Sequence, residues 1–328
     1  GWSGLRETVT AVSPDHFNMW RPMTDPDFPW TGLRIGGTIV GIWYWCTDQY
    51  IVQRTLAAEN IKIGRRGAIF GAYLKLLPIL IFLVPGIIAF ALTIQNPEVF
   101  HVSKADRAFP MLVKTLLPVG LKGLVAGGLM AALMSSLASV FNSCSTIFTI
   151  DIYKQITSQK TEKELLTTGK IATAIIVLLG IIWIPIMEKI GGGVMYQYLQ
   201  NVQSYIAPPV TAVFLLGIIW KRVNAKASIT TLLAGLFLLV LRLGSEIYYQ
   251  PQIVSNQSVD SLLYDFATIN FAHMAIFMFI FSVSLCVIVS LSTTPPDYKL
   301  IAGLSFGTLT PKHKNDLKGS YDTLDFLL

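Results

Sequence analysis

Residues 120–150 read GLKGLVAGGLMAALMSSLASVFNSCSTIFTI, a stretch in which Lys122 is the only charged side chain. A helix rises 1.5 Å per residue, so about 20 apolar residues cross the hydrocarbon core of a bilayer, which is about 30 Å thick. This stretch exceeds that length. It therefore predicts a transmembrane helix that tilts or protrudes beyond the membrane.

Similar apolar stretches recur along the whole chain and predict an all-α integral membrane protein with about seven transmembrane helices. The other six are residues 32–53, 66–94, 167–187, 195–220, 227–247 and 270–292. Of the 328 residues, 53% are hydrophobic and only 13% are charged, about half the charged fraction of a soluble domain. Mean hydropathy is +0.57.

The basic residues lie between the apolar stretches and predict an orientation rather than a nucleic-acid partner. If the first stretch runs inward, the loops after the first, third and fifth stretches and the tail hold fifteen Lys and Arg, whereas the other connections hold eight. The positive-inside rule favours this arrangement. Residues 1–31 are then an extracellular segment, and residues 295–328 are a cytoplasmic tail.

Prolines and glycines interrupt two of the stretches. Pro78 and Pro85-Gly86 lie in the second, Gly191–Gly193 precede the fifth, and Ala207-Pro208-Pro209 lies in its middle. Broken helices near the midplane often mark a transport site. The alternative for any one proline is a packing kink.

No set of residues indicates an enzyme. The four His, at positions 16, 101, 273 and 313, share no helical face, and the three Cys have no metal-binding spacing. The chain starts at Gly1 without an initiator methionine, so we expect a piece of a longer protein.

Lys75 lies nine residues beyond Arg66 inside the second stretch, about 13 Å along a helix axis. An intramembrane charge costs at least a few kcal/mol and needs a partner. Two roles fit equally: a polar ligand contact, or an ion pair with Asp48, the only carboxylate in the first stretch.

Aromatic and polar side chains adjoin in the middle of the first stretch, as Trp43-Tyr44-Trp45 followed by Thr47-Asp48-Gln49. Aromatic rings stack on the apolar face of a sugar, and amide or hydroxyl groups bind its hydroxyls. Core packing is the alternative.

Residues 127–139 combine two features. Their small side chains let helices approach closely, and the adjacent hydroxyls of Ser135 and Ser136 are oxygen ligands for a hard cation.

Several motifs resemble the sodium/solute symporter family, in particular its sodium/glucose cotransporter branch. They are WYWCTDQYIVQR at 43–54, YLKL at 73–76, MSSLAS at 134–139, FTIDIY at 148–153 and WKR at 220–222. The resemblance extends over most of residues 30–295. It implies a leucine-transporter-like inverted-repeat fold, in which residues 32–222 form the second five-helix repeat, residues 223–294 form two peripheral helices, and the first repeat is absent.

The resemblance also implies residue roles. Tyr44 resembles an aromatic gate that stacks under the sugar, with Trp45 beside it, and Lys75 and Gln200 resemble contacts to sugar hydroxyls. The carbonyl of Ala132 and the hydroxyls of Ser135 and Ser136 resemble sodium ligands. Ala138 stands where some members have an extra hydroxyl, which argues against a second sodium ion.

The implied function is sodium-coupled symport of a glucose- or galactose-like sugar by alternating access. Sugar, co-transported sodium and the lipid bilayer are the expected partners, and the expected location is multi-pass in the plasma membrane, or the inner membrane in a bacterial host. Alternatives are a symporter of myo-inositol or another solute, and a sugar sensor or channel-like protein. Without the first repeat, we expect this chain alone to be inactive.

Overall fold

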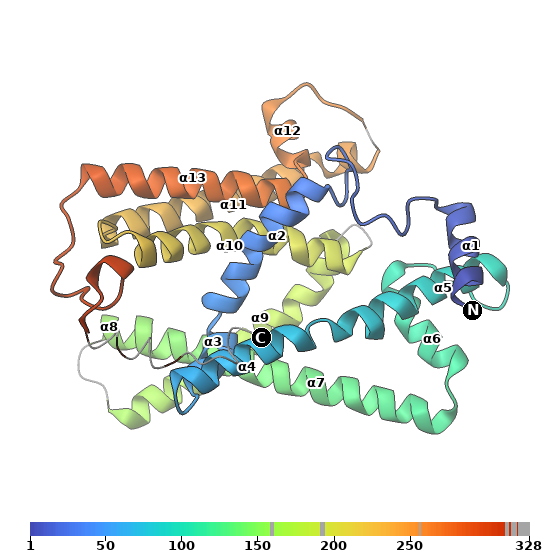
Figure 1. The fold of residues 1–328 in the computed structure, drawn as a ribbon, viewed down its shortest axis with the longest axis horizontal. Coiled ribbons are helices and arrows are strands. Elements are labelled where there is room, and N and C mark those ends of the chain that lie inside the picture. Colours follow the sequence, from blue (N-terminus) through green and yellow to red (C-terminus); the bar gives the residue numbers. More distant parts are fainter. Residues whose placement is uncertain (158–160, 191–193, 256, 312–314, 316–319, 321–328) are drawn as a thin grey trace. The chain divides into compact units, whose positions relative to one another are not determined.

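The computed structural model describes residues 1–157, 161–190, 194–255, 257–311, 315 and 320. Within this part of the chain all regular structure is helical (Figure 1). The chain divides into two compact units: the first comprises Gly1–Phe17 and Ala72–Met195, and the second comprises Asn18–Gly71 and Tyr196–Leu328.

The first unit is built around two long helices that pack together. Its helices are α1 (Trp2–Val12), a π-helical turn (Ile79–Leu83), α5 (Val84–Gln95), a 3₁₀ turn (Ala105–Arg107), α6 (Ala108–Leu116), α7 (Val119–Thr146), a second π-helical segment (Ile147–Tyr153), α8 (Lys154–Ile156) and α9 (Glu162–Ile190). The hydroxyl of Ser145 on α7 donates to the carbonyl of Gly169 on α9 at 2.7 Å. A Cβ at Gly169 would lie 3.4 Å from the Ser145 hydroxyl, an ordinary van der Waals distance, so this hydrogen bond fixes where the two helices meet without requiring a glycine.

The second unit holds the buried core richest in large side chains. Its helices are α2 (Trp30–Cys46), α3 (Gln49–Leu56), α10 (Met195–Ile219), α11 (Ala225–Val254), α12 (Leu262–Thr268), α13 (Phe271–Ser292) and a 3₁₀ turn (Phe306–Thr308); α4 (Ile61–Leu74) begins here and ends in the first unit. Tyr205, Met274 and Met278 are fully buried between α10, α11 and α13.

Glycines on α2 allow α13 to pack directly against it. A Cβ at Gly32 would lie 2.9 Å from the Ala272 side chain, and a Cβ at Gly36 would overlap the Ala272 carbonyl oxygen. Thr31 and His273 share a hydrogen bond of 2.8 Å at the same crossing. This is the small-residue spacing with which membrane helices bring their backbones together.

The segment before α2 forms a turn of its own and is bonded to the start of α13. The Phe28 N–H donates to the Asp25 carboxylate at 2.7 Å, and this bond lowers the pKa of Asp25 below its usual value. Asn270 Nδ2 donates to the carbonyls of Pro26 and Asp27, at 2.7 and 3.0 Å. Residues 25–28 are thereby joined to the start of α13.

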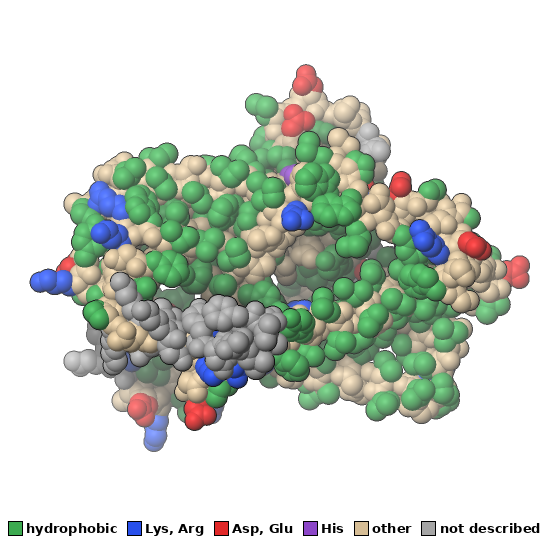
Figure 2. Space-filling model, in the orientation of Figure 1, with side chains coloured by type: hydrophobic (Ala, Val, Ile, Leu, Met, Phe, Trp, Pro, Cys, Tyr) green, Lys and Arg blue, Asp and Glu red, His purple; other side chains and the backbone are tan. Residues whose placement is uncertain are grey.

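Six helical segments of the described chain are long and apolar enough to cross a membrane, rather than the expected seven: Ile61–Gln95, Val119–Ile156, Glu162–Pro185, Met195–Ile219, Ala225–Val254 and Phe271–Ser292. The expected first span is interrupted, because α2 ends at Cys46 and α3 begins at Gln49. The 17 residues of α2 rise about 26 Å, slightly less than the hydrocarbon thickness. Figure 2 shows hydrophobic side chains over much of the visible surface, as expected for helices that face lipid.

The predicted proline breaks have different outcomes. Pro78 and Pro85 do disturb the second span, which has a turn at Lys75-Leu76 and a π-helical turn at Ile79–Leu83. The interruption expected at Ala207–Pro209 is wrong, because α10 is helical from Met195 to Ile219. Pro209 instead packs against α11, where a Cβ at Gly235 would lie 2.5 Å from its ring. The glycines at 191–193 lie outside the described residues.

Candidate functional site

The break after α2 is made by local hydrogen bonds. The N–H and the hydroxyl of Thr47 both donate to the Trp43 carbonyl, at 3.0 and 2.7 Å. The Asp48 carboxylate then accepts from the Tyr50 N–H at 3.1 Å and caps the start of α3. Asp48 therefore has a helix-capping role that does not depend on Lys75.

Tyr44 and Trp45 occupy the last turn of α2, directly before this break. Their rings form an edge-to-face pair with centroids 5.9 Å apart. Tyr44 is half-buried and the Trp45 side chain is 37% exposed, so neither belongs to the buried core of the second unit. A Cβ at Gly71 of α4 would lie 3.6 Å from the Trp45 ring, which shows that this ring lies over Gly71.

Gln200 lies on the first half of α10 and is half-buried. Its Nε2 donates to the hydroxyl of Tyr196, one turn earlier, at 2.7 Å. Gln197 on the same turn donates to the Asp27 carboxylate at 3.1 Å. Tyr196 was not predicted to have a role, although its four-residue spacing from Gln200 places both side chains on one helical face.

Lys75 lies at the helix break in the first unit. Pro78 has no N–H to bond the Leu74 carbonyl, and its ring would clash with that carbonyl in a regular helix. Accordingly α4 ends at Leu74, and the N–H groups of Lys75 and Leu76 bond three residues back, to Ala72 and Tyr73, at 3.1 and 3.0 Å. The Lys75 side chain is exposed within this unit.

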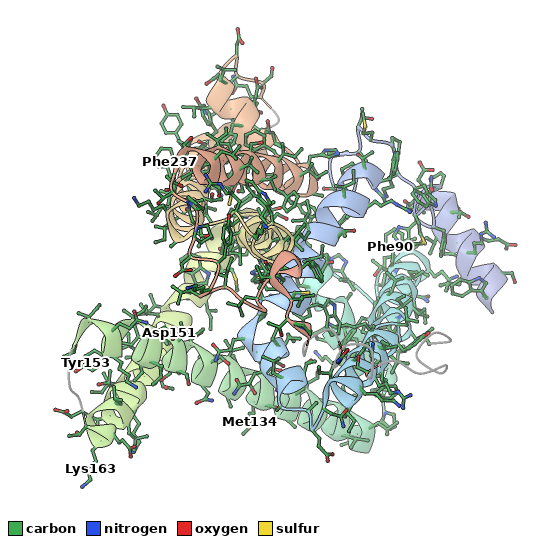
Figure 3. The ribbon with its side chains drawn as sticks, turned by 60° about the vertical axis from the view of Figure 1, so that its left-hand side comes forward. Phe90, Met134, Asp151, Tyr153, Lys163 and Phe237 are labelled. Carbon is green, nitrogen blue, oxygen red and sulfur yellow. The ribbon has the colours of Figure 1, made fainter. Side chains whose placement is uncertain are left out.

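The three predicted sodium ligands share one turn of α7. In an α-helix the carbonyl of residue i points toward residues i+3 and i+4, so the Ala132 carbonyl and the side chains of Ser135 and Ser136 converge on one face. All three residues are exposed within the first unit. The Ser139 hydroxyl donates to the Ser135 carbonyl at 2.9 Å and is thereby engaged within the helix. Figure 3 labels Met134, the neighbour of Ser135 on this helix.

Each unit therefore holds part of the predicted site. Tyr44 and Trp45 are brought together in the second unit, which also contains Gln200, and the first unit contains Lys75 and the α7 turn with its three oxygen ligands. Among the described residues, no three His, Cys, Asp or Glu side chains cluster as metal ligands. The oxygen atoms on α7 that could bind a cation are a carbonyl and hydroxyls, and these ligands suit a hard monovalent or divalent cation.

Comparison with known proteins gives a family match over most of the chain. The model of the family described as "Sodium:solute symporter family" matches residues 4–235. The chain belongs to the sodium:solute symporter family. Members of this family are transporters rather than enzymes, and the six membrane-length helices make this member a multi-pass membrane protein.

Curated relatives of this chain carry two kinds of name. It is 38% identical over 308 residues to sodium/myo-inositol cotransporter 2 of Sus scrofa and 39% identical over 306 residues to sodium/glucose cotransporter 4 of Mus musculus. These alignments cover 90% and 89% of this chain but 45% and 44% of the relatives. The chain thus spans about half the length of the curated relatives it matches.

A solved structure shares the fold. It is a sodium-coupled sialic acid symporter in a substrate-bound outward-open state, 24% identical in sequence, with a TM-score of 0.65. The match covers 90% of this chain and 56% of the other. It confirms the expected all-helical symporter fold class.

Proposed function

We propose that this chain is part of a sodium-coupled sugar symporter that works by alternating access. The observation that carries the proposal is the break of the first span at Thr47-Asp48, directly after Tyr44 and Trp45. A broken helix end next to aromatic faces provides both free backbone groups and stacking surfaces for a polyhydroxylated ring. Family membership supports the same assignment.

In this proposal the sugar-facing roles fall to four side chains. Tyr44 stacks beneath the sugar and closes the inner side of the cavity, with Trp45 beside it. Lys75 donates to sugar hydroxyls from the turn that Pro78 creates, and Gln200 does so from α10 while its amide is oriented by the Tyr196 hydroxyl. Charged and amide donors of this kind give directional hydrogen bonds to hydroxyl oxygens.

The proposed sodium contact is the α7 turn that contains Ala132, Ser135 and Ser136. Its carbonyl and hydroxyl oxygens are ligands of the hardness that an alkali cation prefers, and the helix geometry alone brings them to one face. By family resemblance the remaining ligands belong to the first repeat, and residues 32–222 correspond to the second. Each charge that enters down a potential of 100 mV contributes about 2.3 kcal/mol to sugar accumulation.

Two other functions remain as competing proposals. Relatives named as myo-inositol cotransporters match this chain at 37–41% identity, similar to those named for glucose, so a cyclic polyol is the leading alternative substrate. A sensor or channel-like protein would bind sugar and pass ions without accumulating the sugar. Accumulation against a gradient separates this last case from symport.

The test is uptake by the longer protein that contains this sequence, reconstituted in proteoliposomes with an inward gradient of sodium or of potassium. Labelled glucose and labelled myo-inositol are compared in the same preparation. We expect sodium-dependent accumulation of one of them, and at least a ten-fold higher sodium requirement in Ser136→Ala.

Ser139→Ala is the matched control, because its hydroxyl already bonds within the helix and it lies one turn from the ion-facing oxygens. We expect a normal sodium requirement in this variant. An equal effect of both substitutions would refute the assignment of the α7 turn. Uptake without accumulation would favour the channel-like alternative.

A further inference from the structure

Arg242 is a charged side chain inside a membrane-spanning helix that the proposed function does not use. It lies on α11 and is 3% exposed. A charge buried in a membrane protein is costly unless it is paired and hydrogen-bonded. The groups around Arg242 must therefore compensate its charge.

The guanidinium is held by contacts from three parts of the second unit. Nε donates to Glu246 Oε1 at 2.8 Å, and Nη2 donates to the Ile269 carbonyl at 2.8 Å. The Tyr205 hydroxyl donates to the same Glu246 oxygen at 2.6 Å and accepts from Arg242 Nε at 3.3 Å. The rings of Tyr205 and Phe266 flank the guanidinium carbon, with centroids 5.5 and 5.6 Å away.

These contacts join α10 to α11 and to the connection that precedes α13. We call Tyr205, Arg242 and Glu246 the Arg242 cluster. Tyr205 is 1% exposed and is the only one of the three on α10. The cluster thus anchors α10 through a single side chain.

Tyr205 lies where α10 lacks helical hydrogen bonds. Pro208 and Pro209 cannot donate to the carbonyls four residues earlier, those of Ser204 and Tyr205, so two helical hydrogen bonds are missing at this point. Where such bonds are missing, a helix stays helical only if contacts with neighbouring elements support it. The Arg242 cluster and the packing of Pro209 on Gly235 provide these contacts.

Gln200 lies between two such anchors. On one side Gln197 is bonded to Asp27, and on the other Tyr205 is bonded into the cluster five residues beyond Gln200, about 7.5 Å along the axis. We propose that the Arg242 cluster is a positioning device for the α10 segment that carries Gln200, and that it sets sugar affinity without touching the sugar. This inference rests on the proposed function, because it takes Gln200 as a sugar contact.

The test compares Tyr205→Phe with Tyr249→Phe in the longer symporter. Tyr205→Phe removes one hydroxyl and both of its cluster bonds but keeps the ring. Tyr249→Phe removes a hydroxyl on the same helix as Arg242, and the described partner of this hydroxyl is Ser261, 3.1 Å away and directly before α12. Glu246→Gln is the second cluster variant, which retains an acceptor oxygen but loses the charge.

Two quantities are measured: KM and maximal rate of sodium-driven uptake, and amide hydrogen exchange of residues 196–206 without sugar. For Tyr205→Phe we expect a roughly three- to ten-fold higher KM, a maximal rate within two-fold of the unaltered protein, and faster exchange in this segment. Glu246→Gln should change the same two quantities in the same direction, and Tyr249→Phe should change neither.

Faster exchange with an unchanged KM would show that the cluster is only structural and would overturn the inference. Unchanged exchange would also overturn it. Failure of the proposed function has a different signature, since the unaltered protein itself would then show no sodium-driven sugar uptake; that result would overturn the affinity claim together with the function.

Discussion

Gly36 lies where α2 crosses the backbone of α13, and its missing side chain determines how closely the two helices approach. A Cβ at this position would overlap the Ala272 carbonyl oxygen. We expect Gly36→Ala to force the helices apart and to lower stability by about 1–3 kcal/mol, the usual cost of overpacking. Thermal unfolding in detergent measures this loss of stability, and we expect the midpoint to fall by several degrees.

The neighbouring Gly37 provides the matched control at the residue scale. A Cβ at Gly37 would meet nothing within 4 Å, so Gly37→Ala adds the same methyl group to the same helix without a clash. We expect a midpoint equal to or slightly above that of the unaltered protein, because alanine favours the helix. Equal destabilisation by both variants would mean that helix flexibility, rather than the α2–α13 contact, is what Gly36 provides.

Helices were easier to predict than their ends. The apolar stretches gave the type and place of each long helix, because a hydrophobic run of sufficient length has few other solutions in a bilayer. The end of α2 was missed, since a hydropathy window averages over the Thr47 and Asp48 side chains that cap the break. The continuity of α10 was missed because the sequence around Pro208 and Pro209 does not show their packing partner, Gly235, which is distant in sequence.

At the scale of an element, the turn at Lys75-Leu76 follows from Pro78. Pro78→Ala restores the missing N–H donor and removes the ring clash, so we expect α4 to continue through Lys75 as a regular helix. Lys75 would then move off the turn. We expect sodium-driven sugar uptake to fall at least five-fold, with a thermal midpoint that is unchanged or higher.

Pro118→Ala is the control for this element. Pro118 precedes the first residue of α7, a position whose N–H would make no hydrogen bond within the helix. Its replacement should therefore leave uptake nearly unchanged. Slower hydrogen exchange at residues 74–77 in Pro78→Ala would show that the helix has indeed formed. Normal uptake in a protein with that slower exchange would contradict a role for the turn.

At the scale of the whole molecule, the sequence relates the three proposed sodium ligands on α7 to one another but does not relate them to the rest of the proposed site. Ala132, Ser135 and Ser136 follow helical spacing, so their convergence is a local property of one helix. Tyr44 lies on α2, Gln200 lies on α10 and Lys75 lies in the turn after α4, and no periodicity relates residues so far apart. The pairing of Arg242 with Glu246 could have been predicted from the sequence, because Glu246 follows Arg242 by four residues inside an apolar stretch.

The orientation of the molecule in the membrane is the remaining prediction at this scale. Because the basic residues concentrate in alternate connections, Ser103, between α5 and α6, should be external, and Glu162, at the start of α9, cytoplasmic. In the longer protein, with all native cysteines replaced, Cys46, Cys144 and Cys286 among them, single cysteines at these two positions would be treated with a membrane-impermeant maleimide. We expect Ser103→Cys to react in intact cells and Glu162→Cys to react only after permeabilisation. The opposite pattern would reverse the whole arrangement and place the break after Tyr44 and Trp45 toward the outside, where Tyr44 could not close the inner side of the cavity.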